Sequence, residues 1–230
     1  MAAAVSRKAD GRAARDPART RESMLEAAFD EMHRAGFRGS SLETILARSG
    51  VTKGAMYHHF ADKEALGHAV IDDVIATIMR EKWQLPLQQA ENPVDALIAI
   101  IRSTSVAPEL LARGCPLNNM SQEMAPLDEG FRQRTATLFG DWQSAIAAAL
   151  ERGQRRGLVR KDIDPGDTAT FLIAAYEGYL SLAKSFQGAR GLRAGLKILA
   201  GYLESLRPPG VGKAARAGSR RRRSIERSRA

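Results

Sequence analysis

Apolar residues recur three and four positions apart along most of this 230-residue chain, and no sustained alternation of apolar and polar residues marks a strand. In the segment DPARTRESMLEAAFDEMHRAGF, the residues that fall on one helix face are Met24, Leu25, Ala28, Phe29 and Met32. Later segments repeat this spacing. The pattern therefore predicts an all-α fold.

Residues that start and stop helices divide this pattern into elements. Asp16 can cap a first helix that has Pro17 at its first position, and Gly36 ends that helix. Ser40 and Glu43 have the spacing of a capping box before a short second helix. A tight SGV turn follows, so the two short helices around it are expected to form a helix-turn-helix.

Thr52 can cap a short third helix that ends near Phe60, and Asp62 can cap a longer fourth helix that runs to about Trp83. The remainder is expected to form a helical bundle. Its predicted helices cover residues 93–106, 115–124, 128–157, 165–186 and 191–206, and the segment PELLARG (108–114) is expected to be a loop.

The net charge of +9 is spread unevenly. Residues 1–63 hold 11 basic and 8 acidic residues (+3), residues 64–206 hold 15 and 17 (−2), and residues 207–230 hold 9 and 1 (+8). A polyanionic partner is therefore expected to meet the first segment, the tail or both.

The chain offers no membrane or secretion signal. Its longest apolar runs, ALIAII and FLIAAY, are too short to span a bilayer, and its first residues lack the apolar segment of a signal peptide. A single cysteine, Cys115, excludes an intrachain disulfide framework and fits a reducing compartment. We expect a cytoplasmic protein without a membrane partner or a cofactor.

The third predicted helix has the chemistry of a recognition helix. Its first residues carry little bulk, which suits entry into the major groove of DNA. Lys53 can reach a base edge or a phosphate, Gly54 lets the backbone approach closely, and the Ala55 methyl group can meet a thymine methyl group.

Phosphate contacts are expected around this helix. Tyr57, His58 and His59 come one turn later, where hydroxyl and imidazole donors suit phosphate oxygens, and Lys63 lies in the first turn of the next helix. The alternative is a metal site on the two histidines, but adjacent side chains on a helix point about 100° apart. We therefore expect no metal.

Residues 20–66 resemble the DNA-binding domain of TetR-family transcriptional repressors, and the specific part of the match is Gly-Val-Thr-Lys-Gly-x-x-Tyr-x-His-Phe-x-x-Lys-Glu-x-Leu. The resemblance implies an all-helical homodimer, a palindromic double-stranded operator and a C-terminal domain whose small-molecule ligand lowers DNA affinity. It also implies that the DNA-facing positions are Ser41, Thr44, Lys53, Gly54, Ala55, Tyr57, His58, His59 and Lys63.

This resemblance divides the chain into four parts. We expect a basic flexible N-terminal arm (1–16), a helix-turn-helix DNA-binding domain (17–63), a helical ligand-binding and dimerisation domain (64–206) and a disordered Arg-rich tail (207–230).

The segment TATFLIAAYEGYLSLAKSF places small residues four positions apart, which lets helices approach closely. In the family that the chain resembles, the last two helices of each subunit form a four-helix dimer interface. The residues expected there are Phe171, Ala174, Ala175, Gly178, Tyr179 and Leu182. The alternative is ordinary packing within one chain.

Apolar and aromatic residues of the bundle are candidates for lining a ligand cavity, together with a few polar groups that orient the ligand. The apolar candidates are Met120, Met124, Phe131, Phe139, Trp142, Tyr176 and Trp83, and the polar ones are Asn118, Asn119 and Gln122. Ordinary packing is the alternative for each of them.

Cys115 supports a second hypothesis about regulation. A Gly-Cys pair before a short helix also occurs in family members that sense electrophiles or oxidants, and amides at a helix start lower a thiol pKa. Pro116 removes one of those amides. A thiol-based sensor, a ligand-site residue and a buried inert cysteine are the three interpretations.

An enzyme is the main alternative from another class, with Cys115 as nucleophile. All four histidines lie between positions 33 and 68, so the predicted C-terminal domain has no imidazole base. The sequence also lacks a zinc-protease motif, a phosphate-cradling loop and a G-x-S-x-G motif. A third hypothesis is an architectural DNA binder that acts through the Arg-rich tail.

Overall fold

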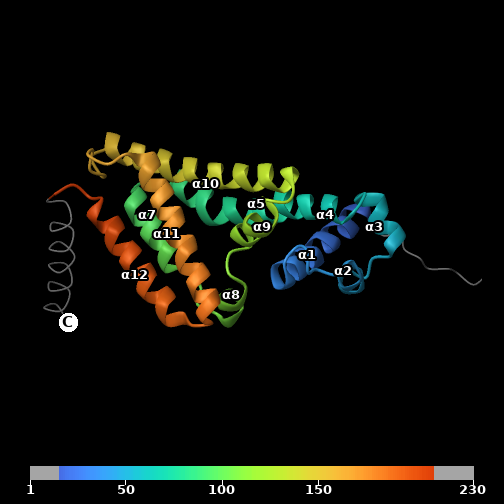
Figure 1. Cartoon of the computed structure of the whole chain (residues 1–230). Coiled ribbons are helices and arrows are strands. Elements are labelled where there is room, and N and C mark those ends of the chain that lie inside the picture. The colour runs from blue at the N-terminus through green and yellow to red at the C-terminus, as the bar shows by residue number, and fades with distance from the viewer. Residues whose placement is uncertain (1–15, 210–230) are drawn as a thin grey trace, which may run out of the picture. The chain divides into compact units, whose positions relative to one another are not determined.

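The computed structural model describes residues 16–209, and every regular element in this range is helical (Figure 1). This confirms the predicted all-α fold. The predicted N-terminal arm and nearly all of the predicted tail lie outside the described residues. The chain divides after Val70 into two compact units, which are described separately below.

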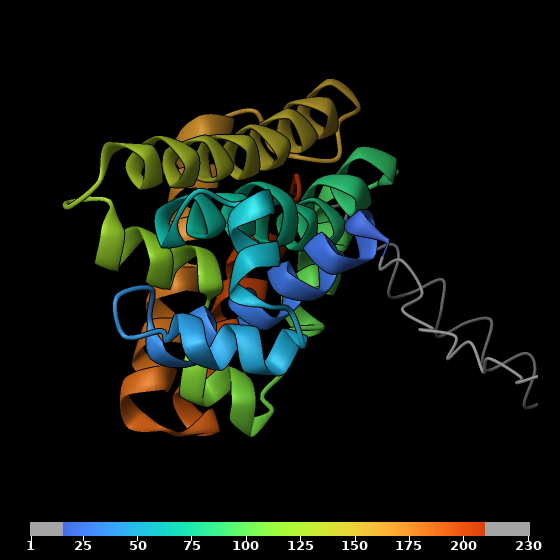
Figure 2. The same cartoon turned by 90° about the vertical axis from the view of Figure 1, so that its right-hand side faces the viewer.

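The first unit contains α1 (Pro17–Ala35), α2 (Leu42–Ser49), α3 (Lys53–His59) and α4 (Lys63–Ala69), drawn from dark blue to cyan in Figure 2. Side chains cap these helices as predicted in three cases. Asp16 accepts from the Ala18 amide at 3.0 Å, Thr52 from the Ala55 amide at 3.3 Å, and Asp62 from the Ala65 amide at 2.7 Å.

The predicted cap of the second helix is shifted by one residue. Ser41 is the cap and its hydroxyl accepts from the Thr44 amide at 3.3 Å. Ser40 is buried instead, and its hydroxyl donates to the Phe37 carbonyl at 2.7 Å. The expected Ser40–Glu43 capping box is therefore wrong, because Ser40 closes the preceding turn.

The core of the first unit forms where α1 packs against α2, α3 and α4. Met24, Ala28, Ile45, Met56 and Leu66 have no exposed surface. Leu66 brings α4 into this unit, whereas the sequence analysis ended the DNA-binding domain at residue 63.

The second unit begins within a helical segment that contains two π-helical turns. A π-helical turn η1 (Val70–Ile75), α5 (Ala76–Met79), a second π turn η2 (Arg80–Gln84) and α6 (Leu85–Gln89) follow one another without a break. The expected end near Trp83 is therefore too early. The helix passes Pro86 because the wider π turn lies directly before it, where an ordinary turn would clash with the ring.

The other helices of this unit are α7 (Pro93–Arg102), α8 (Pro108–Arg113), α9 (Pro116–Met124), α10 (Glu129–Arg155), α11 (Pro165–Phe186) and α12 (Ala189–Ser205). Two expectations are wrong here. The segment PELLARG is helical as α8, and α7 ends at Arg102 rather than near Val106. Both follow from Pro108, which starts a new helix and keeps Ala107 extended.

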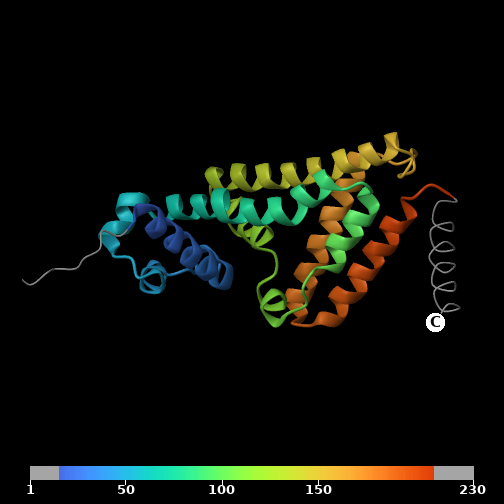
Figure 3. The ribbon, with the colours of Figure 1, turned by 180° about the vertical axis from the view of Figure 1, so that it is seen from behind.

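Helix α12 packs against both α7 and α11, and α10 packs against α11 (Figures 1 and 3). Gly195 of α12 is required for this packing, because a side chain there would overlap the Tyr179 ring of α11. No helix among residues 16–209 is both long and apolar enough to cross a membrane.

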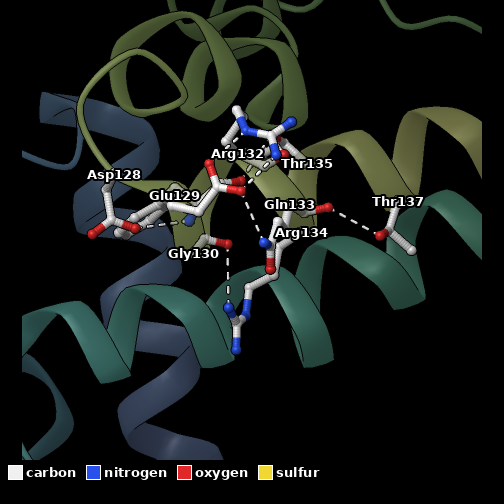
Figure 4. Close-up of polar contacts among 9 residues, drawn as sticks. Asp128, Glu129, Gly130, Arg132, Gln133, Arg134, Thr135 and Thr137 are labelled. Atoms are coloured by element: carbon white, nitrogen blue, oxygen red, sulfur yellow. Dashed lines mark hydrogen bonds and ion pairs between the residues drawn. The ribbon is translucent and has the colours of Figure 1, made fainter.

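The start of α10 shows how its exposed polar residues stabilise it (Figure 4). Asp128 caps the helix by accepting from the Phe131 amide at 2.9 Å. Glu129 accepts from Arg132 at 2.6 Å and from Gln133 at 2.8 Å, and the Arg132 hydrogen bond is the main reason that the pKa of Glu129 falls to about 2.

Candidate functional site

Helix α3 presents one face to solvent and buries the other. Met56 has no exposed surface and Phe60, directly after the helix, is 5% exposed, so these two residues fix α3 to the first unit. Lys53 and Tyr57 lie four residues apart on the other side, and the Lys53 ammonium group is 6.0 Å from the Tyr57 ring centre. Tyr57 is 49% exposed, which is unusual for so large a ring.

Gly54 of α3 has no packing role within the chain. A Cβ atom added at Gly54 would meet no atom within 4 Å. Its lack of a side chain therefore serves nothing in the first unit, and it leaves the backbone of α3 open to close approach from outside.

The two histidines are placed differently from one another. His58 is exposed and His59 is half-buried, with ring centres 5.8 Å apart in an edge arrangement. Within residues 16–209, no group of three or more histidine, cysteine, aspartate and glutamate side chains is placed to hold a metal ion. Ala55 is half-buried beside them.

The remaining predicted DNA contacts come from outside α3. Ser41 and Thr44 lie at the start of α2, both half-buried. The Lys63 ammonium group donates to the carbonyl oxygens of Ser40 at 2.7 Å and Arg38 at 3.4 Å. Lys63 therefore links the start of α4 to the loop before α2, and this link uses two of its three donors.

Glu31 is a residue that the sequence analysis missed. It is 1% exposed and receives two hydrogen bonds from Arg34, at 3.0 and 2.7 Å, while Arg48 lies 3.8 Å away. The Arg34 hydrogen bond is the main reason that the pKa of Glu31 is lowered, and the Ser41 amide adds to it. Glu31 thus ties α1 to both ends of α2. Its position in the sequence could have indicated its burial, because Glu31 falls on the same helix face as the buried residues Met24 and Ala28.

One face of α11 is apolar and exposed. Phe171 and Leu182 are 48% and 51% exposed, and Ala174 and Gly178 lie exposed between them. A Cβ atom at Gly178 would meet nothing within 4 Å, so this glycine is not needed for packing inside the chain. Ala175 and Tyr179, the other predicted interface residues, are half-buried.

Helix α12 also has an exposed apolar face. The resemblance implied a role for the last helix in the interface, but the sequence analysis named no residue on it. Ile198 is 63% exposed, and the residues in line with it are small: Gly191, Ala194 and Gly201. The Phe171 ring of α11 and the Tyr202 ring of α12 pack with centres 4.8 Å apart, so these exposed apolar residues lie on two helices that pack together. Surfaces of this kind mark protein–protein interfaces.

An aromatic cluster forms where η2, α10 and α11 meet. The Trp83 ring centre lies 4.6 Å from that of Trp142 and 5.3 Å from that of Tyr176. The Tyr176 hydroxyl accepts from Lys82 at 2.7 Å and lies 3.0 Å from the Thr104 hydroxyl. The structure therefore brings together three of the residues predicted to line a ligand cavity.

The other predicted ligand residues are spread around this cluster. Met120, Met124 and Phe131 are buried, and Phe139 is half-buried against Trp142 with ring centres 6.3 Å apart. Asn118 is half-buried, Gln122 is exposed, and Asn119 bonds to the Arg113 carbonyl at 2.6 Å and to Lys184 at 3.1 Å. Asn119 is therefore committed to holding the turn before α9.

Cys115 lies at the start of α9 beside Glu177 of α11. The residue keeps some exposed surface, but enough protein surrounds its thiol that burial, followed by the charge of Glu177, raises the thiol pKa well above its ordinary value. The amides of Asn118 and Leu117 oppose this effect only in part. The thiol is therefore protonated at neutral pH and not activated.

Glu177 is the second residue that the sequence analysis missed, although a single acidic residue in FLIAAYEGYL was a signal. It is 7% exposed, and neither of its carboxylate oxygens has a hydrogen-bond partner. Burial raises its pKa to about 7, and the Cys115 thiol and the Lys82 ammonium group offset this only in part.

The chain matches two protein-family models. Residues 24–70 match the one described as bacterial regulatory proteins of the tetR family, and residues 93–199 match the tetracyclin repressor-like C-terminal domain. The first confirms the predicted resemblance, and it ends at the residue after which the two compact units divide.

Curated relatives include an uncharacterized HTH-type transcriptional regulator from Lactococcus lactis, 30% identical over 78% of this chain and 91% of its own length. The A-factor receptor protein of Streptomyces griseus is 31% identical over 84% of this chain, which spans 65% of that protein. The HTH-type transcriptional repressor DhaR of a Mycobacterium species is 29% identical over 69% of this chain and 79% of its own length.

Among solved structures, a TetR transcriptional regulator from Chloroflexus aurantiacus is 30% identical with a TM-score of 0.73, covering 82% of this chain and 96% of that one. The reduced form of Escherichia coli NemR is 25% identical with a TM-score of 0.72, covering 84% of this chain and 99% of that one.

Proposed function

Because the chain belongs to the TetR family of DNA-binding transcriptional regulators, we propose that it is a repressor that binds a palindromic operator as a homodimer in the cytoplasm. A small, largely apolar molecule releases it from the DNA. The observation that carries the proposal is the exposed face of α3, where a lysine, an open glycine and a half-exposed tyrosine have no packing role.

In this proposal α3 enters the major groove. Lys53, Gly54 and Ala55 approach the base edges, while Tyr57 and His58 reach phosphates on the groove wall. Ser41 and Thr44 at the start of α2, together with His59 and Lys63, complete the phosphate contacts. The shared role of these residues is to fix the register of α3 on the duplex.

Dimerisation uses the apolar face of α11 and α12. Two copies of this face bury Phe171, Leu182 and Ile198 against each other, and the small residues Ala174 and Gly178 let the helices approach closely. A two-fold dimer presents two α3 helices and therefore reads two half-sites.

Effector binding is proposed for the second unit, at the aromatic cluster of Trp83, Trp142 and Tyr176. A molecule releases DNA only if it binds more tightly to the conformation in which the two α3 helices are mis-spaced for the operator. The protonated, deactivated thiol of Cys115 favours this model over the thiol-based sensor.

Selection of bound DNA from a random pool tests the proposal. We expect a palindromic consensus with half-site centres separated by about one helical turn or a multiple of it. A non-palindromic consensus would contradict the proposed homodimer. If no DNA sequence is enriched, sequence-specific DNA binding is contradicted.

Deleting residues 208–230 distinguishes this proposal from an architectural DNA binder. That segment holds 8 basic residues and 1 acidic residue, so it contributes affinity for any DNA. We expect the deletion to weaken binding to all sequences alike and to flatten the salt dependence. Loss of the preference for the consensus would show that the segment reads sequence.

A further inference from the structure

Three buried polar atoms stand out among the described residues 16–209. They are the indole nitrogen of Trp142 and the two carboxylate oxygens of Glu177. None of them makes a hydrogen bond of ordinary geometry, and the Cys115 thiol acts on Glu177 only as a weak donor. Trp142 is 1% exposed and Glu177 is 7% exposed, so water does not readily supply the missing partners. Native proteins leave few such groups, because each one costs free energy.

The orphan groups belong to one cluster. The Trp142 ring lies edge-on to Tyr176 with ring centres 6.0 Å apart. Lys82 links Tyr176 to Glu177, because its ammonium group donates to the Tyr176 hydroxyl and its charge acts on the Glu177 carboxylate. The neighbouring polar group is satisfied, since the Tyr176 hydroxyl is bonded to Lys82 and Thr104. The cluster therefore holds one unused donor and one unused acceptor among aromatic rings.

We infer that Trp142 and Glu177 are the polar anchors of the effector site. The indole N–H donates to an acceptor oxygen of the effector, and the Glu177 carboxylate accepts from a hydroxyl or amide N–H of the same molecule. The effector is thus a neutral, mainly aromatic or apolar molecule with one carbonyl-type acceptor and one donor. This rests on the proposed function, which places effector binding in the second unit.

Charge balance favours a neutral effector over a charged one. The Lys82 ammonium group already acts on the Glu177 carboxylate and lies 5.1 Å from the Tyr176 ring centre. The chain therefore already places one positive charge beside this carboxylate, which offsets part of the cost of its burial. A charged effector would bring an uncompensated charge among aromatic rings, which is costly.

The start of α9 provides the edge of the site that is open to solvent. Cys115, directly before α9, interacts with Glu177 and is half-buried, as is Asn118. Asn118 is linked to α11 only through a long hydrogen bond of 3.4 Å to the Ser181 hydroxyl, one turn beyond Glu177. We therefore assign the entrance to the contact between α9 and α11.

Four small probes separate the two anchors: 4-hydroxyacetophenone carries a donor and an acceptor, acetophenone only an acceptor, 4-ethylphenol chiefly a donor, and ethylbenzene neither. Both tryptophans of the chain lie in the cluster. The two indole N–H signals of the ¹⁵N-labelled full-length protein therefore report binding at the site. We expect 4-hydroxyacetophenone to move the Trp142 signal downfield and to bind roughly tenfold more tightly than acetophenone or 4-ethylphenol.

Variants identify the anchors. Trp142→Phe should lower the affinity of 4-hydroxyacetophenone to that of 4-ethylphenol, and Glu177→Leu should lower it to that of acetophenone. Trp83→Phe removes an indole from the same site without removing an orphan donor. It should change the affinity of all four probes alike, so the tenfold ratio between them should persist. Glu177→Met, which keeps the length of the side chain without an oxygen acceptor, serves if the leucine variant does not fold.

The assignment is overturned if the four probes bind equally, if the variants do not change their ranking, or if no probe at millimolar concentration moves the Trp142 signal. DNA binding is measured separately on the selected consensus. A chain that binds its consensus but fails the probe ranking contradicts only the effector site. A chain that ranks the probes as expected but selects no DNA contradicts the proposed function.

Discussion

Among residues 16–209, each of the two units buries one glutamate, and the pKa values of these two carboxyl groups shift in opposite directions. In the first unit, Glu31 is held by Arg34 and lies near Arg48, and its pKa is lowered. In the second unit, Glu177 has no hydrogen-bond partner, and its pKa is raised to about 7. Burial costs a carboxylate free energy in both places, but only the first unit supplies the compensating bonds.

This difference matches what each unit is proposed to do. A DNA-reading unit must hold α2 and α3 in one arrangement, and a paired buried charge fixes the helices that it joins. An effector-binding unit must change its preferred state when a molecule arrives, and an unpaired group leaves free energy for that molecule to recover. We call the first unit closed, because its buried carboxylate is paired, and the second unit open, because its buried carboxylate is not.

The largest expected effect concerns the pH dependence that Glu177 adds. Its folded-state pKa of about 7 lies above the ordinary value of 4.5, so the folded protein binds more protons than the unfolded chain between these values. Its contribution to stability therefore falls as the pH rises from about 4.5 through about 7. We expect Glu177→Gln to raise the free energy of unfolding at pH 8 by up to about 3 kcal/mol, and to leave it nearly unchanged at pH 4.5.

Denaturant unfolding at both pH values measures this effect. Glu81→Gln is the matched control, because Glu81 is an exposed glutamate of the same unit. It should change stability little at either pH. Equal effects of the two variants at pH 8 would mean that burial does not destabilise the ionised form of Glu177, and the contrast with Glu31 would disappear.

Dimerisation should give the next largest effect. Gly178→Leu places a large side chain on the exposed face of α11, where two subunits are proposed to approach closely. A monomer reads one half-site, so we expect operator affinity to fall by roughly 100-fold or more. Gel filtration measures the loss of the dimer, and an operator titration measures the fall in affinity.

Gly140→Leu on α10 is the control for this substitution, because a Cβ atom there also meets nothing within 4 Å. It should leave the dimer and its affinity unchanged. A Gly178→Leu protein that stays dimeric with full affinity would place the interface elsewhere.

The same contrast explains what the sequence could and could not predict. The exposed face of α3 was predictable, because its motif, its cap Thr52 and its buried anchors are all local. The shift of the cap from Ser40 to Ser41 was not, since it depends on which serine the preceding turn buries. The segment PELLARG lacks a clear apolar period, so α8 could not be distinguished from a loop.

The two buried glutamates show a stronger limit on what can be predicted from sequence. In the sequence, each is an acidic residue at a position on the buried face of its helix. Their neighbours in the folded chain distinguish them. Arg48 lies 17 positions after Glu31, and Lys82 and Cys115 lie far before Glu177 in the sequence. Pairing across elements is invisible to helical periodicity, so their opposite pKa shifts required the fold.

Glu31→Gln tests the closed unit. The arginines that pair with Glu31 are about half exposed, so we expect a loss of about 1–3 kcal/mol in the free energy of unfolding of the first unit at pH 7. Operator affinity should fall with it. Because the pKa of Glu31 is lowered, its stabilising contribution is present above the ordinary value of 4.5 and is lost as the pH falls further.

Glu26→Gln is the matched control, since Glu26 is exposed on the same helix. The difference between the two variants should shrink as the medium becomes more acidic. A difference that stays constant with pH would assign the effect to side-chain packing rather than to the ion pair.

The smallest expected effect separates DNA contact from folding within the first unit. Tyr57 is half exposed, so Tyr57→Phe should leave stability unchanged and weaken operator binding by about 1 kcal/mol through the loss of one neutral phosphate contact. Its salt dependence should not change, because no charge is removed. Lys63→Ala should instead lower both stability and affinity, because it also loses the bonds to Ser40 and Arg38, and it should reduce the salt slope by about one. If Lys63→Ala lowers stability but leaves the salt slope unchanged, Lys63 serves the closed unit alone, and α3 docks without it.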